Sequence, residues 1–196
     1  MNAVSPRLLP LLLAVAAPLA LAACAAAVKG DVSSPYYAVP VGSTVELHRS
    51  VTIPPGRTRV FIQNGVVSTG FDSYRTSCAL EITELDRDDP QIVEPDTFRV
   101  RDVQRISLEE VVEAAPLRLA ALGGLLRVAD DGGAPMVYEG WHLWLESPRQ
   151  PGVRRLSCRG EFADVAVAEP PSIREIRDAL GDLATLELAG PSSPDQ

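Results

Sequence analysis

The stretch that decides the fold is Val137-Tyr-Glu-Gly-Trp-His-Leu-Trp-Leu-Glu146, Ser147-Pro-Arg-Gln-Pro-Gly152 and Val153-Arg-Arg-Leu-Ser-Cys-Arg-Gly-Glu-Phe162. Two extended runs on either side of a Pro/Gly loop are typical of a β-hairpin. Because alternate side chains of a strand share a face, one face of the first run holds Trp141, Leu143 and Leu145, which we expect in a core. The opposite face holds Tyr138, His142 and Trp144. These three are either an exposed binding surface for a protein or a sugar, or are covered by a second layer.

Four further segments have the alternation of strands. They are residues 45–53, with Val45, Leu47, Val51 and Ile53 inward; 58–63, with Val60 and Ile62 on one side; 74–83; and the less regular 97–106. Proline and glycine punctuate these segments at roughly regular spacing. The pattern predicts a mainly β fold, either an antiparallel β-sandwich or a small open barrel.

Residues 107–130 are harder to assign. Ser107-Leu-Glu-Glu110 has the form of a capping box that begins a helix. The apolar residues 111–128 fit a helix or a pair of buried strands, but Pro116 and Gly123-Gly124 interrupt any continuous helix. We expect a short helical turn followed by one or two strands, and a turn at 130–133.

The C-terminal segment predicts one amphipathic helix over about 172–187. Ser172 and Glu175 form a second capping box. Apolar side chains then recur at helical spacing at Ile173, Ile176, Leu180 and Leu183. We expect this stripe to close one side of the sandwich or, alternatively, to dock into a partner or fold over the open edge of the sheet. Residues 190–196 are expected to form a disordered tail.

The first 24 residues have the organisation of an export leader. A short start carrying Arg7 precedes an apolar stretch, 8–21, that ends in Leu21-Ala-Ala-Cys24. This ending resembles the lipobox of bacterial lipoproteins. The resemblance implies cleavage between Ala23 and Cys24 and attachment of lipid to Cys24. An ordinary cleaved leader with a chance cysteine is the alternative.

The lipobox resemblance also implies a location. Bacterial lipoproteins carry two or three acyl chains such as palmitate, which together anchor a protein durably to a membrane. Ala25 stands where an inner-membrane lipoprotein of enteric bacteria would usually have Asp, which favours the outer membrane, facing the periplasm. We expect residues 24–35 to be a tether and 36–189 a single domain. The chain as a whole is similar to small envelope lipoproteins of Gram-negative bacteria, a likeness that brings no active site to transfer.

The two remaining cysteines, Cys78 and Cys158, predict a disulfide. The periplasm is oxidising, and each cysteine alternates with apolar neighbours on its strand, so both sulfurs should point toward the core. A bridge would close a loop of about 80 residues, worth about 4–5 kcal/mol in the chain-entropy model. Two buried free thiols are the alternative.

The charge of the chain excludes several partner classes. Removing residues 1–23 takes away one arginine and no acid, so 18 basic residues become 17 against 26 acidic ones, and the formal charge moves from −8 to −9. Such acidity argues against nucleic acid and against polybasic contact with anionic lipid. We therefore expect the membrane link to be the lipid itself.

Catalytic and metal-binding motifs are missing from the sequence. His48 and His142 lie in strand patterns without partners that would make a zinc or nucleophile site. Asp86, Asp88 and Asp89 resemble part of a calcium loop but lack its central Gly and closing Glu. We expect no catalytic residue, no metal site, no cofactor and no enzyme activity.

Three functions remain open. The first is a non-catalytic, lipid-anchored β-domain that binds another envelope protein or stabilises an envelope assembly. The second is a β-module that binds a small apolar ligand or a glycan, between its sheets or on the aromatic strand. The third is an enzyme with an unrecognised carboxylate dyad, which a deep cleft with two converging carboxylates would favour.

The lipobox resemblance generates a direct test. Cys24→Ala removes the lipid attachment atom but no part of the predicted domain, so the variant should fold and leave the membrane fraction. Fractionation with a high-salt wash and immunoblotting measures this. A variant that stays in the washed membranes would contradict the lipid anchor.

Overall fold

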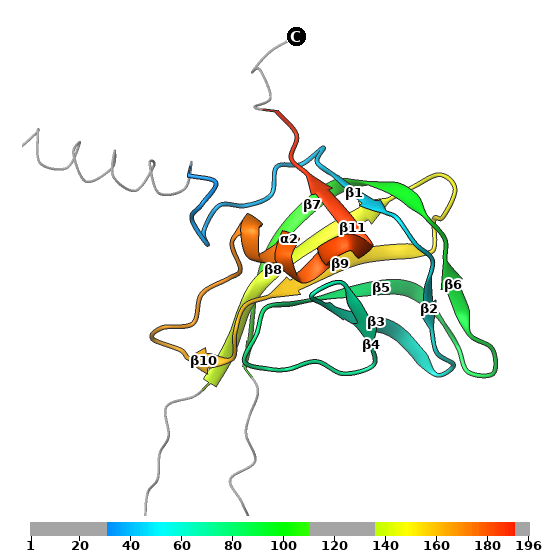
Figure 1. Cartoon of the computed structure of the whole chain (residues 1–196), viewed down its shortest axis with the longest axis horizontal. Helices are drawn as coiled ribbons and strands as arrows, with labels where there is room; N and C mark the ends of the chain where they lie inside the picture. Colours follow the sequence, from blue (N-terminus) through cyan, green and yellow to red (C-terminus); the bar gives the residue numbers. More distant parts are fainter. Residues whose placement is uncertain (1–30, 110–135, 191–196) are drawn as a thin grey trace, which may run out of the picture.

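Strands dominate the part of the chain that the computed structural model describes, residues 31–109 and 136–190 (Figure 1). The elements are β1 (Thr44–Leu47), β2 (Val51–Ile53), β3 (Arg57–Gln63), β4 (Val66–Ser68), β5 (Ser77–Asp86), β6 (Gln91–Val93), β7 (Asp96–Glu109), β8 (Met136–Glu146), β9 (Val153–Arg159), β10 (Ala163–Asp164), α2 (Ile173–Leu180), the 3-10 turn η1 (Gly181–Leu183) and β11 (Ala184–Glu187). The main sheet runs β11-β1-β7-β8-β9-β5-β3-β4, with β10 beside β8, and β2 pairs with β6 separately. The main sheet is antiparallel and strongly curled into a half-barrel. The mainly β prediction is confirmed, in its open-barrel form.

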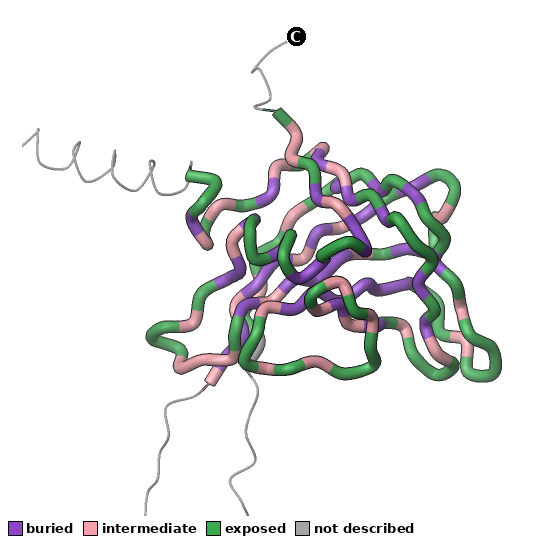
Figure 2. The backbone as a smooth tube through the Cα atoms, viewed as in Figure 1, coloured by how far each residue is buried: buried purple, intermediate pink, exposed green. Residues whose placement is uncertain are grey.

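The core lies between the inner face of the curled sheet and the helix. The predicted hairpin of β8 and β9 is present, and Leu143 sits between Val103 of β7 and Leu156 of β9 in the ladder. The expected inward residues Trp141, Leu143 and Leu145 are all buried. Figure 2 shows the buried positions running along the central strands and beneath the helix. Alternation on β8 therefore sets which residues reach the core.

Helix α2 covers the open side of the half-barrel, against β3, β5 and β11. Its capping box forms as predicted: the Ser172 hydroxyl accepts from the Glu175 N–H, and the Glu175 carboxylate accepts from the Ser172 N–H. The predicted apolar stripe is buried at Ile173, Ile176 and Leu180. Of the expectations for this stripe, closing one side of the sheet is the one observed.

The predicted helix over about 172–187 is too long. Gly181 has φ of 51°, a left-handed conformation that ends α2, and its backbone lies against Gly65 so closely that a Cβ would stand 2.9 Å from the Gly65 Cα. After η1 the chain extends into β11, which pairs with β1 at Val45↔Leu186. Leu183 is buried as expected, but from the 3-10 turn and not from the helix. Pairing of residues 184–187 with the edge of β1 therefore outweighs the helical spacing of the apolar residues in this segment.

The predicted strand over 45–53 divides into two. β1 pairs with β7 and β11, whereas β2 pairs with β6 in the smaller sheet. The break falls at 48–50, where the His48 N–H donates to the Leu183 carbonyl. Val45, Leu47, Val51 and Ile53 are nevertheless all buried, as the alternation predicted.

The strand predicted over 74–83 begins later and ends later, at Ser77 and Asp86. The Gln63 side-chain amide donates to the carbonyls of Asp72, Arg75 and Thr76. These bonds give the carbonyls of the preceding segment a side-chain partner in place of a strand ladder, so the segment remains a loop.

The predicted helix start at Ser107 is wrong. Ser107 and Glu109 belong to β7 and pair with Glu139 and Val137 of β8. The sheet ladder satisfies the backbone groups that a capping box would otherwise bind, so pairing decides the structure here. The expectations for 111–128, for the turn at 130–133 and for the tail 191–196 lie outside the described residues.

Residues 31–35, the end of the predicted tether, form turns. The Ser34 N–H donates to the Asp31 carbonyl, and Ser34 is buried. The tether expectation for 24–30 lies outside the described residues. Among those that are described, no helix combines the length and apolarity needed to span a bilayer.

The disulfide between Cys78 and Cys158 is present. The two residues are register partners on β5 and β9, with Cα atoms 4.0 Å apart and a sequence separation of 80. Both are fully buried in the core. The bridge therefore fastens neighbouring central strands that are distant in sequence.

Removing this bridge should destabilise the fold without changing it. For Cys78→Ala/Cys158→Ala we expect the free energy of unfolding to fall by about 2–5 kcal/mol, because the unfolded chain regains the entropy of a long loop. Urea unfolding followed by circular dichroism measures the change. Reductant should destabilise the wild-type protein similarly and leave the double variant unaffected, and a wild-type protein indifferent to reductant would contradict the prediction.

Candidate functional site

The predicted row of Tyr138, His142 and Trp144 lies on the outer face of β8, away from the core. Its members differ in exposure: Tyr138 is only 3% exposed, while His142 and Trp144 are half-buried. Tyr138 packs against Phe162, with ring centroids 4.7 Å apart, and against Phe71 at 6.1 Å. The covering-layer alternative therefore describes the Tyr138 end of the row, and only the Trp144 end reaches the surface.

Three arginines surround Trp144. The guanidinium carbons of Arg101, Arg154 and Arg155 stand 5.5, 5.2 and 5.2 Å from a ring centroid of the indole. Each distance is within the range of a cation–π contact, which is worth about 0.5–1 kcal/mol at exposed sites. We refer to these four residues as the Trp144 site.

Two β-bulges at one level of the sheet create this arrangement. Between β7 and β8 the register passes from Val100↔Leu145 to Asp102↔Trp144, which leaves Arg101 as the extra residue. Between β5 and β9 it passes from Glu81↔Arg155 to Ile82↔Val153, which leaves Arg154 extra. A bulge re-aims a side chain. Here the bulges on both neighbours of β8 direct an arginine toward the same indole.

The third arginine of the site, Arg155, is held in place by a buried carboxylate. Arg155 donates through Nε and Nη2 to Oε2 of Glu81, both at 2.8 Å, and the Ser157 hydroxyl donates to Oε1 at 2.9 Å. Glu81 and Ser157 are buried on the outer face. A buried carboxylate needs such partners. The Glu81 carboxylate therefore holds the Arg155 guanidinium in place and compensates its positive charge.

The positive charges of the other two arginines are not compensated by any described residue. Arg101 and Arg154 are exposed, and within the described part of the chain neither forms an ion pair. His142 adds no further charge at neutral pH. Burial lowers its pKa, the positive Arg155, Arg159 and Arg154 lower it further, and only Glu81 opposes them.

A groove of about 850 Å³ lies beside the Trp144 site. Arg99, Arg101 and Arg154 line it, and Glu146 pairs with Arg99 at 3.0 Å. Pro148 and Pro151 of the β8–β9 loop form part of its wall. The volume is within the range of small-ligand pockets. The arrangement can bind a negatively charged group against a partly apolar wall.

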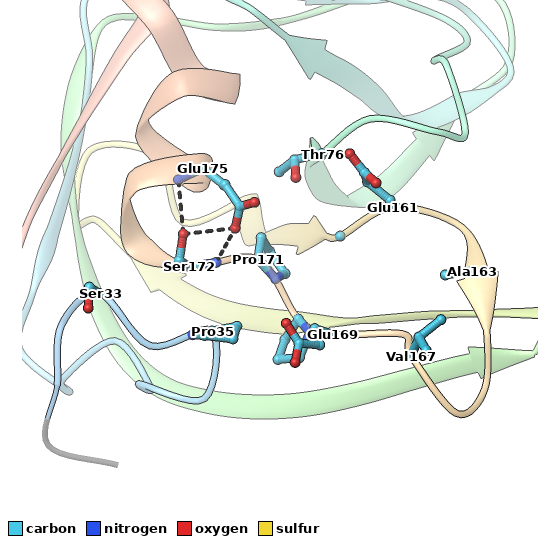
Figure 3. Close-up of a pocket in the computed structure, with 12 residues that line it drawn as sticks. Ser33, Pro35, Thr76, Glu161, Ala163, Val167, Glu169, Pro171, Ser172 and Glu175 are labelled. Carbon is cyan, nitrogen blue, oxygen red and sulfur yellow. Dashed lines mark hydrogen bonds between the residues drawn. The ribbon is translucent and has the colours of Figure 1, made fainter. Parts of the chain in front are cut away.

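A second hollow, of about 330 Å³, lies near the start of α2 (Figure 3). Glu161, Glu169 and Glu175 reach it from three different segments, and no hydrogen bond joins any two of these described carboxylates. Glu175 is engaged in the helix cap, where Oε2 accepts from the Ser172 N–H and hydroxyl at 2.8 Å each. Nothing in this geometry singles out an acid and a base.

The remaining candidate residues lie apart from one another. His48 stands between β1 and β2, not within a strand as expected, with Nε2 2.9 Å from the Thr185 hydroxyl. Asp86 accepts the N–H groups of Asp89 and Asp88, which lowers its pKa and closes an ordinary acidic turn. Within 31–109 and 136–190 no three His, Cys, Asp or Glu side chains are grouped to hold a metal.

Sequence reasoning missed the arginines of the site. Their signal is visible only afterwards: Arg154-Arg155 puts two charges in succession where a strand should alternate, and Arg101 interrupts the alternation of β7. Bulges such as these break the period of two on which strand prediction relies.

Comparison with known proteins adds no relative: the chain matches no family model, no curated protein and no solved structure.

Hydrogen bonds to the Asp96 carboxylate hold the β8–β9 loop, which borders the groove, in place. This buried carboxylate accepts from the Ser147 hydroxyl at 2.6 Å, from Gln150 at 3.2 Å, from Arg149 and from the Thr97 N–H at 2.7 Å. Burial alone would raise the pKa of Asp96. The four donors outweigh it and lower the pKa from 3.8 to about 2.

Asp96 should therefore make the fold acid-sensitive. Because its folded pKa lies below its unfolded pKa, its contribution is complete above about pH 4 and is lost as pH falls toward 2, a loss of about 2 kcal/mol. Asp96→Asn should lack this component. Urea unfolding at pH 5 and pH 2 measures the difference. Asp88→Asn, in an exposed turn, should lose stability like the wild type, and an equal loss in Asp96→Asn would refute the assignment.

Proposed function

We propose that this chain is a lipid-anchored, non-catalytic protein of the cell envelope that binds another envelope protein through the Trp144 site. The anchor is the lipid on Cys24, at the outer membrane and facing the periplasm. The observation that carries the binding role is the convergence of Arg101, Arg154 and Arg155 on one half-buried tryptophan.

The composition of the Trp144 site supports recognition of a protein. Tryptophan and arginine dominate the residues that contribute most to protein interfaces. The guanidinium groups lie within cation–π distance of the indole, a contact that should reduce the side-chain entropy lost on binding relative to arginines without such a contact. Arg101 and Arg154 are exposed and available to a partner.

The position of the site on the sheet supports the same role. β8 is flanked on both sides by paired strands, so Trp144 stands on a rigid surface and not on a loop. A rigid platform keeps contact residues in place with little reorganisation on binding.

A ligand-binding module is the second candidate, because the groove of about 850 Å³ beside the Trp144 site has the size of a small-ligand pocket. On this alternative the groove holds a small ligand or a glycan, and the arginines orient it. The two candidates differ in what a cross-linker at the site would capture.

Site-specific photo-cross-linking in the host separates them. We replace Asp102, the exposed register partner of Trp144, with a photoreactive amino acid, and use the exposed Ile92 of β6 as the control position. Position 102 should yield one dominant protein adduct by mass spectrometry, reduced at least tenfold by Trp144→Ala, while position 92 should yield none.

The folding of each variant is checked by its urea unfolding midpoint. Absence of a specific protein adduct at position 102, or an adduct that forms equally at position 92, would overturn the protein-binding role.

A further inference from the structure

We infer that the groove beside Trp144 is a carboxylate-binding site, and that an acidic segment of a partner polypeptide occupies it. This inference rests on the proposed protein-binding role and specifies the chemistry of the partner.

The charge balance at the groove is positive although the chain is acidic. Three arginines line the groove, and Glu146 neutralises only Arg99. Asp102 lies on the same face, but its Oδ1 accepts from the Val103 N–H at 2.9 Å and it pairs with neither Arg101 nor Arg154. Among the described residues, no ion pair therefore compensates the positive charges of Arg101 and Arg154, although the formal charge of the whole chain is −8.

The geometry suits carboxylates. A guanidinium group that stacks on an aromatic ring keeps its N–H donors at its edge, in the plane where a carboxylate binds with two parallel hydrogen bonds. Arg101 and Arg154 reach Trp144 from strands on opposite sides of β8. The site can thus receive two carboxylates, one on each side of the indole.

The surroundings favour a short acidic segment over a polyanion. Nucleic acid or an anionic membrane would present many negative charges to a chain whose formal charge is −8, and this net charge opposes the binding of a polyanion. Pro148 and Pro151 line the groove and offer apolar contact to the methylenes of Asp and Glu side chains, whereas Leu145 and Val153, which also border it, are buried in the core. A peptide supplies both the carboxylates and this apolar surface.

The test is peptide binding to the purified full chain in detergent. The probe is a twelve-residue peptide with two Asp-Glu pairs in a neutral background, compared with the same peptide carrying Asn-Gln. Binding is followed by fluorescence anisotropy and by tryptophan emission, since Trp141 and Trp144 are the two tryptophans of the chain and Trp141 is buried. The acidic peptide should bind at least tenfold more tightly than the amide peptide, and more weakly as salt rises.

The arginines are tested by Arg101→Gln/Arg154→Gln, which should weaken acidic-peptide binding at least tenfold. Its matched control is Arg87→Gln/Arg174→Gln, which removes the same charge from exposed positions elsewhere and should bind like the wild type. Equal affinity for the two peptides would overturn the inference, as would unchanged binding by Arg101→Gln/Arg154→Gln. Tighter binding of inorganic phosphate or a galacturonate oligomer than of the acidic peptide would also overturn it.

The two proposals fail in different experiments. If the adduct at position 102 persists in Arg101→Gln/Arg154→Gln, the acidic-segment inference is wrong and the protein-binding role stands. If no protein is captured at position 102, the protein-binding role itself is wrong.

Discussion

The register of the three central strands fixes the rest of the structure. Cys158 of β9 pairs with Cys78 of β5 on one side and with Trp141 of β8 on the other. The disulfide makes one of these pairings covalent. Since a shift by one residue would turn every side chain to the other face, this row keeps Trp141 in the core and Trp144 outside. The pairing of β5, β8 and β9 thus determines both which side chains form the core and which form the binding face.

The outer face departs from an ordinary solvated sheet surface because it contains a buried ion pair. Glu81 is buried there, and Arg155 and Ser157 supply the hydrogen bonds that its charge requires. The same contact holds Arg155 beneath Trp144. An apolar residue at position 81 would remove the burial cost but would leave Arg155 without its anchor. The position of Arg155 in the Trp144 site therefore depends on the buried ion pair.

Local periodicity was sufficient to predict most of the fold. The alternation of Trp141, Leu143 and Leu145 indicated the hairpin and its core face, and the apolar setting of Cys78 and Cys158 indicated their bridge. Pairing partners are not encoded locally, so the sequence around Ser107 predicts a helix start although Ser107 pairs with Glu139 of β8 in the sheet. For the same reason the helical spacing predicts a C-terminal helix that continues through residues 184–187, which instead pair with β1.

The binding site was only half predictable for a related reason. Trp144 follows the period of two and lies on the outer face as the period predicts, whereas Tyr138 follows the same period and is covered by Phe71 and Phe162. Coverage depends on segments far away in sequence. Arg101 and Arg154 reach Trp144 because they break the period. A bulge becomes visible only when both strands of a ladder are known, so the residues that give the site its charge were the least accessible to sequence reasoning.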